Sequence, residues 1–232
     1  MSSRPFSSLL ILCVAFCCTT TSAETIAIIG TGNVARALGV EFALQGHTIV
    51  YGSRTPASSK AQNLVAETSD AASATTPSDA ITGANIVVLA VPGILAKEIA
   101  EGLGDLSGKI IIDPTNPMER KLMTFHHAVA TSNAQIIQDI APKADVVKAF
   151  NTLGWKTMID PETAGGAVSI PLAGESASAK KTVAKLATAM GLEPIDVGGV
   201  ENAHWLEGMA ILLLNNRYGT RDSFDYHLRR SE

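Results

Sequence analysis

Cysteine is scarce in this chain of 232 residues, and all three cysteines, Cys13, Cys17 and Cys18, lie close to the N-terminus. The rest of the chain therefore has no thiol for a disulfide or for a thiolate metal site. Charged residues make up only 17% of the chain and aromatic residues 5%, whereas 46% of the residues are hydrophobic. This balance predicts one globular domain with a large core and little disorder.

Long hydrophobic runs are lacking as well. The N-terminal run from Leu9 to Cys18 has roughly ten residues, about half of what a helix needs to span a bilayer. Arg4 precedes this run, and Thr21 and Ala23 follow it, so residues 1–23 are typical of a signal peptide cleaved after Ala23. We expect an exported protein, periplasmic or secreted, with no stable membrane span after cleavage. The alternatives are an uncleaved N-terminal anchor, or a cytoplasmic protein whose start codon is misassigned.

Basic residues are outnumbered by acidic ones. Only Arg4 of the 18 basic residues lies in the predicted leader, which has no acid, so the remainder carries 17 bases against 22 acids, a net charge of −5. A negative domain without a basic stripe does not suit nucleic acid, and no nucleic-acid partner is expected.

Short β-branched strands alternate with helical segments beyond residue 24. The predicted strands are 25–29, 48–51, 86–91, 109–113, 145–150, 167–173 and 194–197. The predicted helices are 33–45, 57–67, 94–103, 132–140, 176–190 and 201–216, with a capping box from Ser132 to Gln135 and Gly191 just past a helix end. This order predicts a Rossmann-like α/β fold, a doubly wound and mostly parallel sheet with a short C-terminal α/β extension. Residues 24–216 would form one domain, and residues 217–232 a polar, loosely packed tail.

A glycine-rich turn follows the first predicted strand, where residues 30–35 read Gly-Thr-Gly-Asn-Val-Ala. In such a turn Gly30 permits the sharp bend, Gly32 lets the backbone approach a pyrophosphate, and Ala35 allows close packing of helix and strand. The helix N-terminus offers amides and partial positive charge to phosphates. The pattern predicts a dinucleotide site, the alternative being a glycine turn without a ligand.

The end of the second strand indicates which dinucleotide would bind. An NAD enzyme usually has a carboxylate here for the ribose hydroxyls, but this chain has Ser53 and Arg54. Arg54 can form charge-assisted hydrogen bonds to a 2′-phosphate, and Ser53 can donate another. The predicted cofactor is therefore NADP(H), unless Arg54 is only a solvated surface charge.

Three further strand ends should face the same crevice, because ligands of an open parallel sheet lie across the carboxyl ends of its strands. They contribute Ala90, Val91 and Pro92 after one strand, Asn116 after the next, and Ala149 and Asn151 after a third.

These motifs together resemble a known family, the NADP oxidoreductases that use the deazaflavin coenzyme F420, and the related N-terminal reductase domain of the STEAP metalloreductases. The likeness runs from about Thr25 to Asn216. It rests on residues 30–33, 52–54, 90–92, 146–151 and the late segment 196–207, which reads Asp-Val-Gly-Gly-Val-Glu-Asn-Ala-His-Trp-Leu-Glu.

The resemblance implies hydride transfer between NADPH and a second flat redox acceptor, which could be F420, a flavin, a quinone or a ferric chelate. Such a step needs positioning of two ring systems more than an acid or base, so no catalytic residue and no metal are expected. The implied contacts are Gly30, Thr31, Gly32, Asn33 and Val34 with the pyrophosphate, Ser53 and Arg54 with the 2′-phosphate, and Val91, Pro92, Ala149 and Asn151 with the nicotinamide.

Other interpretations stay open. The chain could be a non-catalytic NADP(H)-binding sensor or partner module, or an imine or keto reductase with Lys148 or His204 as proton donor. His126 and His127, in a predicted loop, are a weak candidate for a metal site. In the last predicted helix, Trp205 could flank a flat substrate. The surface of this helix is apolar nearly all round, which suggests either a buried helix or a homodimer contact. No Tyr-x-x-x-Lys motif is present, which excludes the short-chain dehydrogenase mechanism.

Overall fold

The computed structural model describes residues 23–122, 124–218, 224 and 227–231. Apart from Ala23, the predicted signal peptide lies outside the described residues, as does part of the predicted tail. Within the described part of the chain, no helix is both long enough and apolar enough to cross a membrane.

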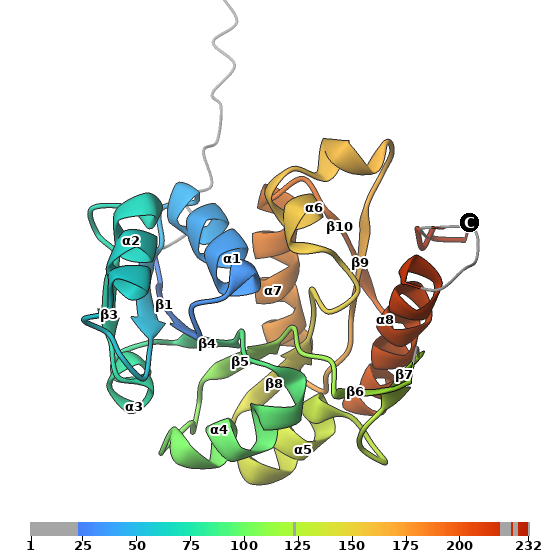
Figure 1. Cartoon of the computed structure of the whole chain (residues 1–232), viewed down its shortest axis with the longest axis horizontal. Helices are drawn as coiled ribbons and strands as arrows, with labels where there is room; N and C mark the ends of the chain where they lie inside the picture. Colours follow the sequence, from blue (N-terminus) through green and yellow to red (C-terminus); the bar gives the residue numbers. More distant parts are fainter. Residues whose placement is uncertain (1–22, 123, 219–223, 225–226, 232) are drawn as a thin grey trace, which may run out of the picture.

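A six-stranded parallel sheet forms the centre of the fold (Figure 1). Its strands are β1 (Thr25–Ile29), β2 (Thr48–Gly52), β3 (Ser73–Thr75), β4 (Ile86–Leu89), β5 (Ile110–Asp113) and β8 (Asp145–Lys148). Their order in space is β3-β2-β1-β4-β5-β8, so the direction of winding reverses between β1 and β4. The predicted doubly wound sheet is confirmed, and the reversal marks the place where such sheets hold ligands.

Helices cover both faces of this sheet, and alternate residues of each strand enter different cores. In β1, Ile26 and Ile28 are buried on one face, and Ala27 and Ile29 on the other. The first face is covered by α1 (Asn33–Leu44), α2 (Ser59–Thr68), α6 (Trp155–Ile159) and α7 (Ala177–Ala189). The second is covered by α3 (Pro77–Ala80), α4 (Ala96–Gly102), α5 (Asn133–Ile140) and α8 (Ala203–Arg217). Strands buried on both sides explain the continuous apolar runs in the sequence.

The C-terminal extension is a separate two-stranded parallel sheet. Strands β9 (Ser169–Leu172) and β10 (Glu193–Asp196) flank α7, and one antiparallel bridge from Lys148 to Ala173 joins β9 to the main sheet. The described part of the chain also contains three 3-10 helices, η1 (Gly93–Leu95), η2 (Pro161–Ala164) and η3 (Val200–Asn202). Gly191 follows α7 with a φ of +78°, as the helix-end pattern predicts.

Two described residues of the predicted tail form hydrogen bonds to the C-terminal extension. The Leu228 amide donates to the Ser169 hydroxyl at 2.7 Å, and the Arg230 guanidinium donates to the Pro194 carbonyl at 2.9 Å. These bonds hold the tail against β9 and β10.

An antiparallel hairpin that the sequence did not predict connects β5 to α5. It consists of β6 (Met118–Lys121) and β7 (Thr124–His127), so His126 and His127 lie in a strand and not in a loop. Its residues are mostly polar, which hides the strand period. The Asn215 side chain on α8 pairs with the backbone of Phe125, accepting from its amide and donating to its carbonyl at 2.8 Å. The outer edge of the hairpin is thereby bonded to a helix.

Two strands of the main sheet, β4 and the edge strand β8, end earlier than predicted. β4 stops at Leu89 and β8 at Lys148, so Ala90 and Ala149 begin loops at the crevice edge. At the end of β8 the strand geometry is broken by Phe150, whose φ of +63° lies in the left-handed region. A buried non-glycine residue in that region stores backbone strain, which is typical of functional sites.

Candidate functional site

Gly30 makes the bend at the carboxyl end of β1. Its φ is +120°, its amide donates to the Gly52 carbonyl at 2.9 Å, and an added Cβ would overlap the carbonyl oxygen of Ala90. Only glycine therefore fits between the ends of β2 and β4.

Gly32 has a different role, since it is the N-cap of α1 with ordinary extended backbone. No side chain caps the helix, no acidic residue lies in its first turn, and a Cβ at Gly32 would meet nothing within 4 Å. The protein itself does not require glycine here. The open space and the uncapped amides of α1 fit a pyrophosphate that approaches the backbone closely.

The end of β2 carries the predicted 2′-phosphate residues. Ser53 is nearly buried, its amide donates to the Thr75 carbonyl at 2.8 Å, and its hydroxyl accepts from the Thr55 amide at 3.2 Å. Arg54 is exposed and forms no hydrogen bond or ion pair with any residue that the structure describes. An unpaired guanidinium beside the glycine turn fits a second phosphate group.

The loops after β4, β5 and β8 meet at the nicotinamide side. Gly93 lies so close to the Asn116 carbonyl that a Cβ there would overlap it. The Asn116 and Asn151 side chains are joined, since Asn151 Nδ2 donates to Asn116 Oδ1 at 2.9 Å and Asn116 Nδ2 donates to the Asn151 carbonyl at 2.9 Å. Asn151 Oδ1 is buried without a partner among the described residues. Val91 is half-buried and Pro92 exposed, but Ala149 has no exposed surface, so Ala149 supports this loop from below.

Beneath these loops lies a buried group of charged residues, which we call the ion cluster: Asp113, Lys148, Glu207 and His127. The Lys148 ammonium donates to Asp113 Oδ2 at 2.9 Å, to Glu207 Oε1 at 2.5 Å and to the Thr115 carbonyl. Lys148, Asp113 and Glu207 are all completely buried. Lys148 therefore faces the cluster and is not available as the proton donor that the imine reductase alternative requires.

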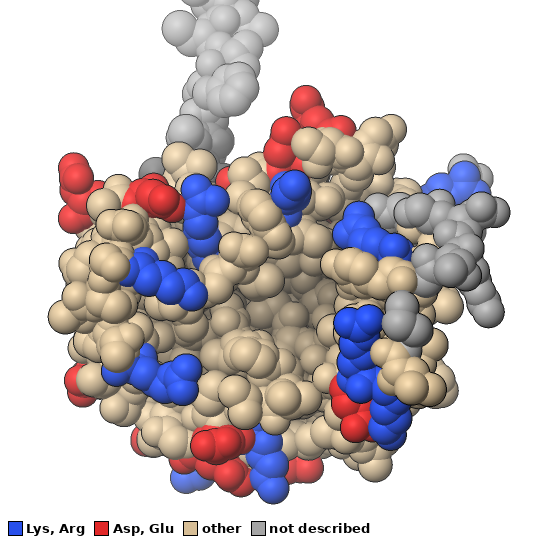
Figure 2. All heavy atoms as spheres, in the orientation of Figure 1, with Lys and Arg blue, Asp and Glu red and all other residues tan. Residues whose placement is uncertain are grey.

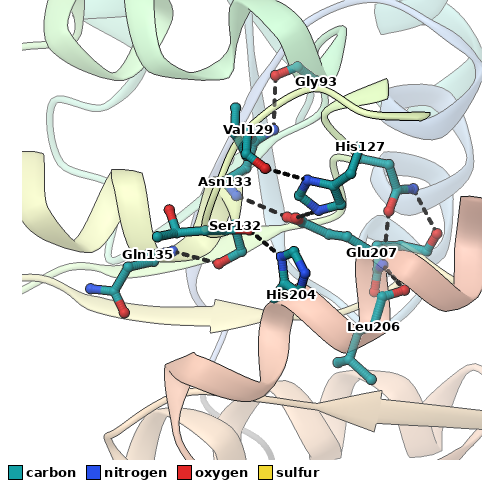
Figure 3. Close-up of polar contacts among 12 residues, drawn as sticks. Gly93, His127, Val129, Ser132, Asn133, Gln135, His204, Leu206 and Glu207 are labelled. Carbon is teal, nitrogen blue, oxygen red and sulfur yellow. Dashed lines mark hydrogen bonds and ion pairs between the residues drawn. The ribbon is translucent and has the colours of Figure 1, made fainter. Parts of the chain in front are cut away.

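His127 connects the ion cluster to the surface. Its Nε2 lies 2.8 Å from Glu207 Oε2 and its Nδ1 lies 2.7 Å from the Val129 carbonyl oxygen (Figure 3). The His204 ring lies beside it, with 4.5 Å between ring centroids, and contacts the Thr131 carbonyl. Burial raises the pKa of the Glu207 carboxyl, an effect that the neighbouring Lys148 ammonium partly opposes.

The sequence identified Lys148, His127 and His204 as separate candidates but gave no role to Glu207 and did not join them into one cluster. Their spacing along the chain is irregular, so no local pattern could have joined them. Within the described residues, no group of three or more His, Cys, Asp or Glu side chains is arranged to hold a metal ion. Trp205 is 69% exposed and points away from the core.

A cavity of about 570 Å³ adjoins the nicotinamide side. It begins at Thr152, directly after Asn151, and extends to Arg217 at the end of α8. Its other lining residues come from α6 and the loop before it, the loop before β9, α8 and the tail: Leu153, Gly154, Thr157, Ala164, Gly165, Gly166, Ala167, Val168, Leu213, Phe224 and His227. Figure 2 shows this face of the molecule hollowed in its middle, with basic side chains on either side of the hollow.

The strand order, the glycine turn and the open N-terminus of α1 define a dinucleotide-binding domain of the Rossmann type. A sequence model of the family described as NADP oxidoreductase, coenzyme F420-dependent, matches residues 25–117. Metalloreductase STEAP3 of Rattus norvegicus is 29% identical over 193 residues, which cover 83% of this chain and 37% of the relative. The F420-dependent NADP reductase of Methanothermobacter thermautotrophicus is 27% identical over 212 residues, covering 82% of this chain and 88% of the relative.

Solved structures agree with these similarities. A protein from Arthrobacter sp. FB24, provisionally assigned as an F420-dependent NADP reductase, has a TM-score of 0.81 at 29% identity and covers 90% of this chain and 100% of its own. A reductive aminase from Aspergillus terreus in complex with NADPH has a TM-score of 0.61 at 22% identity, over 85% of this chain and 62% of its own, and shares the fold alone.

The expected resemblance to F420-dependent NADP oxidoreductases and to STEAP metalloreductases is thus confirmed. The descriptions of the matching family and of these relatives agree with the predicted class, NADP-dependent oxidoreductase, and with the predicted cofactor, NADP(H). The chain spans little more than a third of the length of the metalloreductases that it matches.

Proposed function

We propose that this protein is an NADP(H)-dependent oxidoreductase that transfers hydride between NADPH in the crevice and a second flat acceptor in the adjoining cavity. One observation carries the proposal: the unblocked N-terminus of α1 at Gly32 lies at a strand end next to that of Arg54, which has no partner among the described residues. These are the two groups that a dinucleotide with an additional 2′-phosphate requires.

Each part of the crevice would have one task in this reaction. The amides around Thr31, Asn33 and Val34 would hold the pyrophosphate, and Ser53 and Arg54 the 2′-phosphate. The bound cofactor supplies or accepts a hydride at its nicotinamide ring. The loops after β4, β5 and β8 would orient that ring and exclude water, with no acid or base in the transfer itself.

The cavity is the proposed acceptor site. It begins one residue beyond Asn151, so an occupant would lie beside the nicotinamide side of the crevice. Phe224 can pack against a flat ring, and Arg217 can attract an anionic group on the acceptor. These features favour a flavin or deazaflavin such as F420 over a small keto or imine substrate, for which Lys148 is not available as a proton donor.

A direct test of the cofactor site compares NADPH and NADH binding in the wild type and in Arg54→Glu. The exchange replaces an attractive partner of the 2′-phosphate by a repulsive one. A charge-assisted hydrogen bond is worth about 1.5–3 kcal/mol, so the dissociation constant of NADPH should rise by about tenfold to hundredfold. The dissociation constant of NADH should hardly change. Lys60→Glu, an exposed charge reversal in α2, is the matched control. Equal losses for both cofactors in Arg54→Glu would refute the assignment.

The acceptor is tested by mixing the protein with NADPH and, separately, F420, FMN, a quinone and a ferric chelate while following cofactor absorbance. Oxidation of NADPH with one of them supports the enzyme and names its acceptor. Tight NADPH binding without turnover across a broad panel would instead support the non-catalytic sensor.

A further inference from the structure

We propose that the ion cluster is the positioning device of this site: it fixes the nicotinamide loops relative to α8, in the state in which Glu207 and His127 together hold one proton. This inference rests on the proposed function, because it assigns a role to residues beside the hydride-transfer geometry. None of the four side chains needs to contact the cofactor.

The hydrogen bonds of the ion cluster lead to the three loops at the nicotinamide side. Lys148 immediately precedes the β8 loop and donates to the Thr115 carbonyl in the β5 loop. Glu207 Oε1 accepts from the Asn133 amide at 2.9 Å, and Asn133 Nδ2 donates to the Gly93 carbonyl in the β4 loop at 2.8 Å (Figure 3). All three loops that border the nicotinamide side are thus connected to one carboxylate and one ammonium.

The helix that carries Glu207, α8, contacts both the nicotinamide side and the cavity. One turn before the middle of α8, the Leu206 carbonyl accepts from Asn151 Nδ2 at 2.9 Å, and further along the same helix Leu213 and Arg217 line the cavity. A shift of Glu207 would therefore move the acceptor side relative to the nicotinamide side. An error of about 1 Å in such an arrangement can slow a reaction by about a hundredfold.

The hydrogen bonds of His127 show how many protons it shares with Glu207. The Val129 carbonyl can only accept, so Nδ1 of His127 carries a hydrogen. On the other side, Nε2 of His127 faces a carboxylate oxygen of Glu207. Either the imidazolium donates to the carboxylate, or the neutral imidazole accepts from a protonated Glu207. Both forms hold one proton in the same hydrogen bond.

Charge balance explains why that proton matters. With it, the ammonium of Lys148 and the carboxylate of Asp113 compensate each other, and the Glu207–His127 pair is neutral as a unit. Without it, the cluster has one uncompensated negative charge in a buried place, and a lone pair of His127 faces a carboxylate. Unpaired buried charge is strongly unfavourable, so loss of the proton should loosen β7 and α8.

Few other titratable groups face the pair. His204 on α8 stacks on His127 and is half-buried. On the other packed elements the titratable side chains are exposed at the surface: Glu119, Arg120, Lys121, His126, Asp139 and Glu201. The proton of the pair is therefore governed mainly by the cluster itself.

The test uses Glu207→Gln and His127→Gln, with Glu201→Gln and His126→Gln as exposed controls. For each we measure the NADPH dissociation constant, the fluorescence lifetime of bound NADPH, and the single-turnover hydride-transfer rate across pH. Glu207→Gln should leave NADPH affinity within about threefold, because the phosphate groups are held elsewhere. Its amide can take the place of the protonated carboxyl, so the rate of transfer near neutral pH should stay within about threefold of the wild type, and the decline at alkaline pH should disappear.

His127→Gln keeps a donor toward Glu207 but cannot titrate, so the decline should move to lower pH, where Glu207 alone holds the proton. His127 is partly exposed, which keeps this variant informative if Glu207→Gln does not fold. Glu207→Gln that keeps the alkaline decline of Glu201→Gln would overturn the inference. So would equal losses in affinity and rate, which indicate only a structural role.

The proton itself can be tested without any acceptor. In the cofactor-free protein, the ¹⁵N resonances of His127 should show hydrogen at Nδ1 and a second proton shared at Nε2 near neutral pH. A bare Nε2 at neutral pH would refute the proton assignment. Absence of NADPH binding or of turnover in the wild type would instead count against the proposed function.

Discussion

Two glycines of α1, Gly32 at its N-cap and Gly39 in its middle, allow a paired test of which part of the helix meets the cofactor. At Gly32 a Cβ would project into open space. Alanine is a poorer N-cap than glycine, so Gly32→Ala should cost roughly 0.5–1 kcal/mol of stability. For a protein of this size that lowers the melting temperature by only a few degrees.

The effect of Gly32→Ala on NADPH should be much larger. The new methyl group would occupy the space through which the pyrophosphate approaches the first amides of α1. Loss of two charge-assisted hydrogen bonds, at about 1.5–3 kcal/mol each, corresponds to roughly 3–6 kcal/mol. The dissociation constant should therefore rise by about 10²- to 10⁴-fold, as measured by fluorescence titration.

Gly39→Ala is the matched control within the same helix. A Cβ there would overlap the Tyr51 hydroxyl and its ring, which are completely buried. Overpacking costs about 1–3 kcal/mol, and a rigid ring places this case at the upper end, above the roughly 1 kcal/mol that alanine gains in a helix. Gly39→Ala should thus melt earlier yet bind NADPH normally when folded. If Gly32→Ala binds NADPH as the wild type does, the pyrophosphate does not lie at this turn.

Two further predictions concern stability. Burial raises the pKa of Tyr51 from 10.0 to about 12, so its neutral hydroxyl stabilises the fold below pH 10 and this contribution is lost as pH rises toward about 12. About 3 kcal/mol of this stability should be lost over that range in the wild type but not in Tyr51→Phe. Parallel curves of unfolding free energy against pH for the two proteins, measured by denaturant unfolding, would contradict this. Leu122 is exposed in the β6–β7 hairpin and has a φ of +56°, a strained conformation for a residue with a side chain. Leu122→Gly should therefore raise the free energy of unfolding by up to about 1 kcal/mol. An unchanged free energy of unfolding would mean that the hairpin turn opens freely.

Five of the six strands of the main sheet could be predicted from the sequence because they are short, mostly buried apolar runs, whereas β3, which is short and exposed to half-buried, was missed. Residues 25–29 and 86–89 are β-branched or apolar throughout, and the glycine turn fixed where the first helix begins. The predicted strand ends were less accurate, since Phe150 is apolar and gives no local sign of its left-handed conformation. The predicted capping box forms only in part: the Ser132 hydroxyl accepts from the Gln135 amide at 3.0 Å, but the Gln135 side chain donates to Asp139 instead.

The proposed pyrophosphate and 2′-phosphate residues could be proposed from the sequence because they lie in two short contiguous segments, 30–34 and 53–54. The ion cluster was not, because Asp113, His127, Lys148 and Glu207 come from three strands and a helix and meet only in the folded chain. The β6–β7 hairpin escaped prediction for a related reason. Its strands are stabilised by Asn215, about 90 residues away in the chain, and not by an apolar face of their own.

The order of strands in the sheet has a practical consequence for engineering. Arg54 follows β2, near one edge, whereas the cavity begins after β8, at the opposite edge, with β1, β4 and β5 in between. Substitutions more than about 7–10 Å apart without shared partners usually have additive effects. Nucleotide preference and acceptor preference can therefore be redesigned in separate libraries and recombined afterwards.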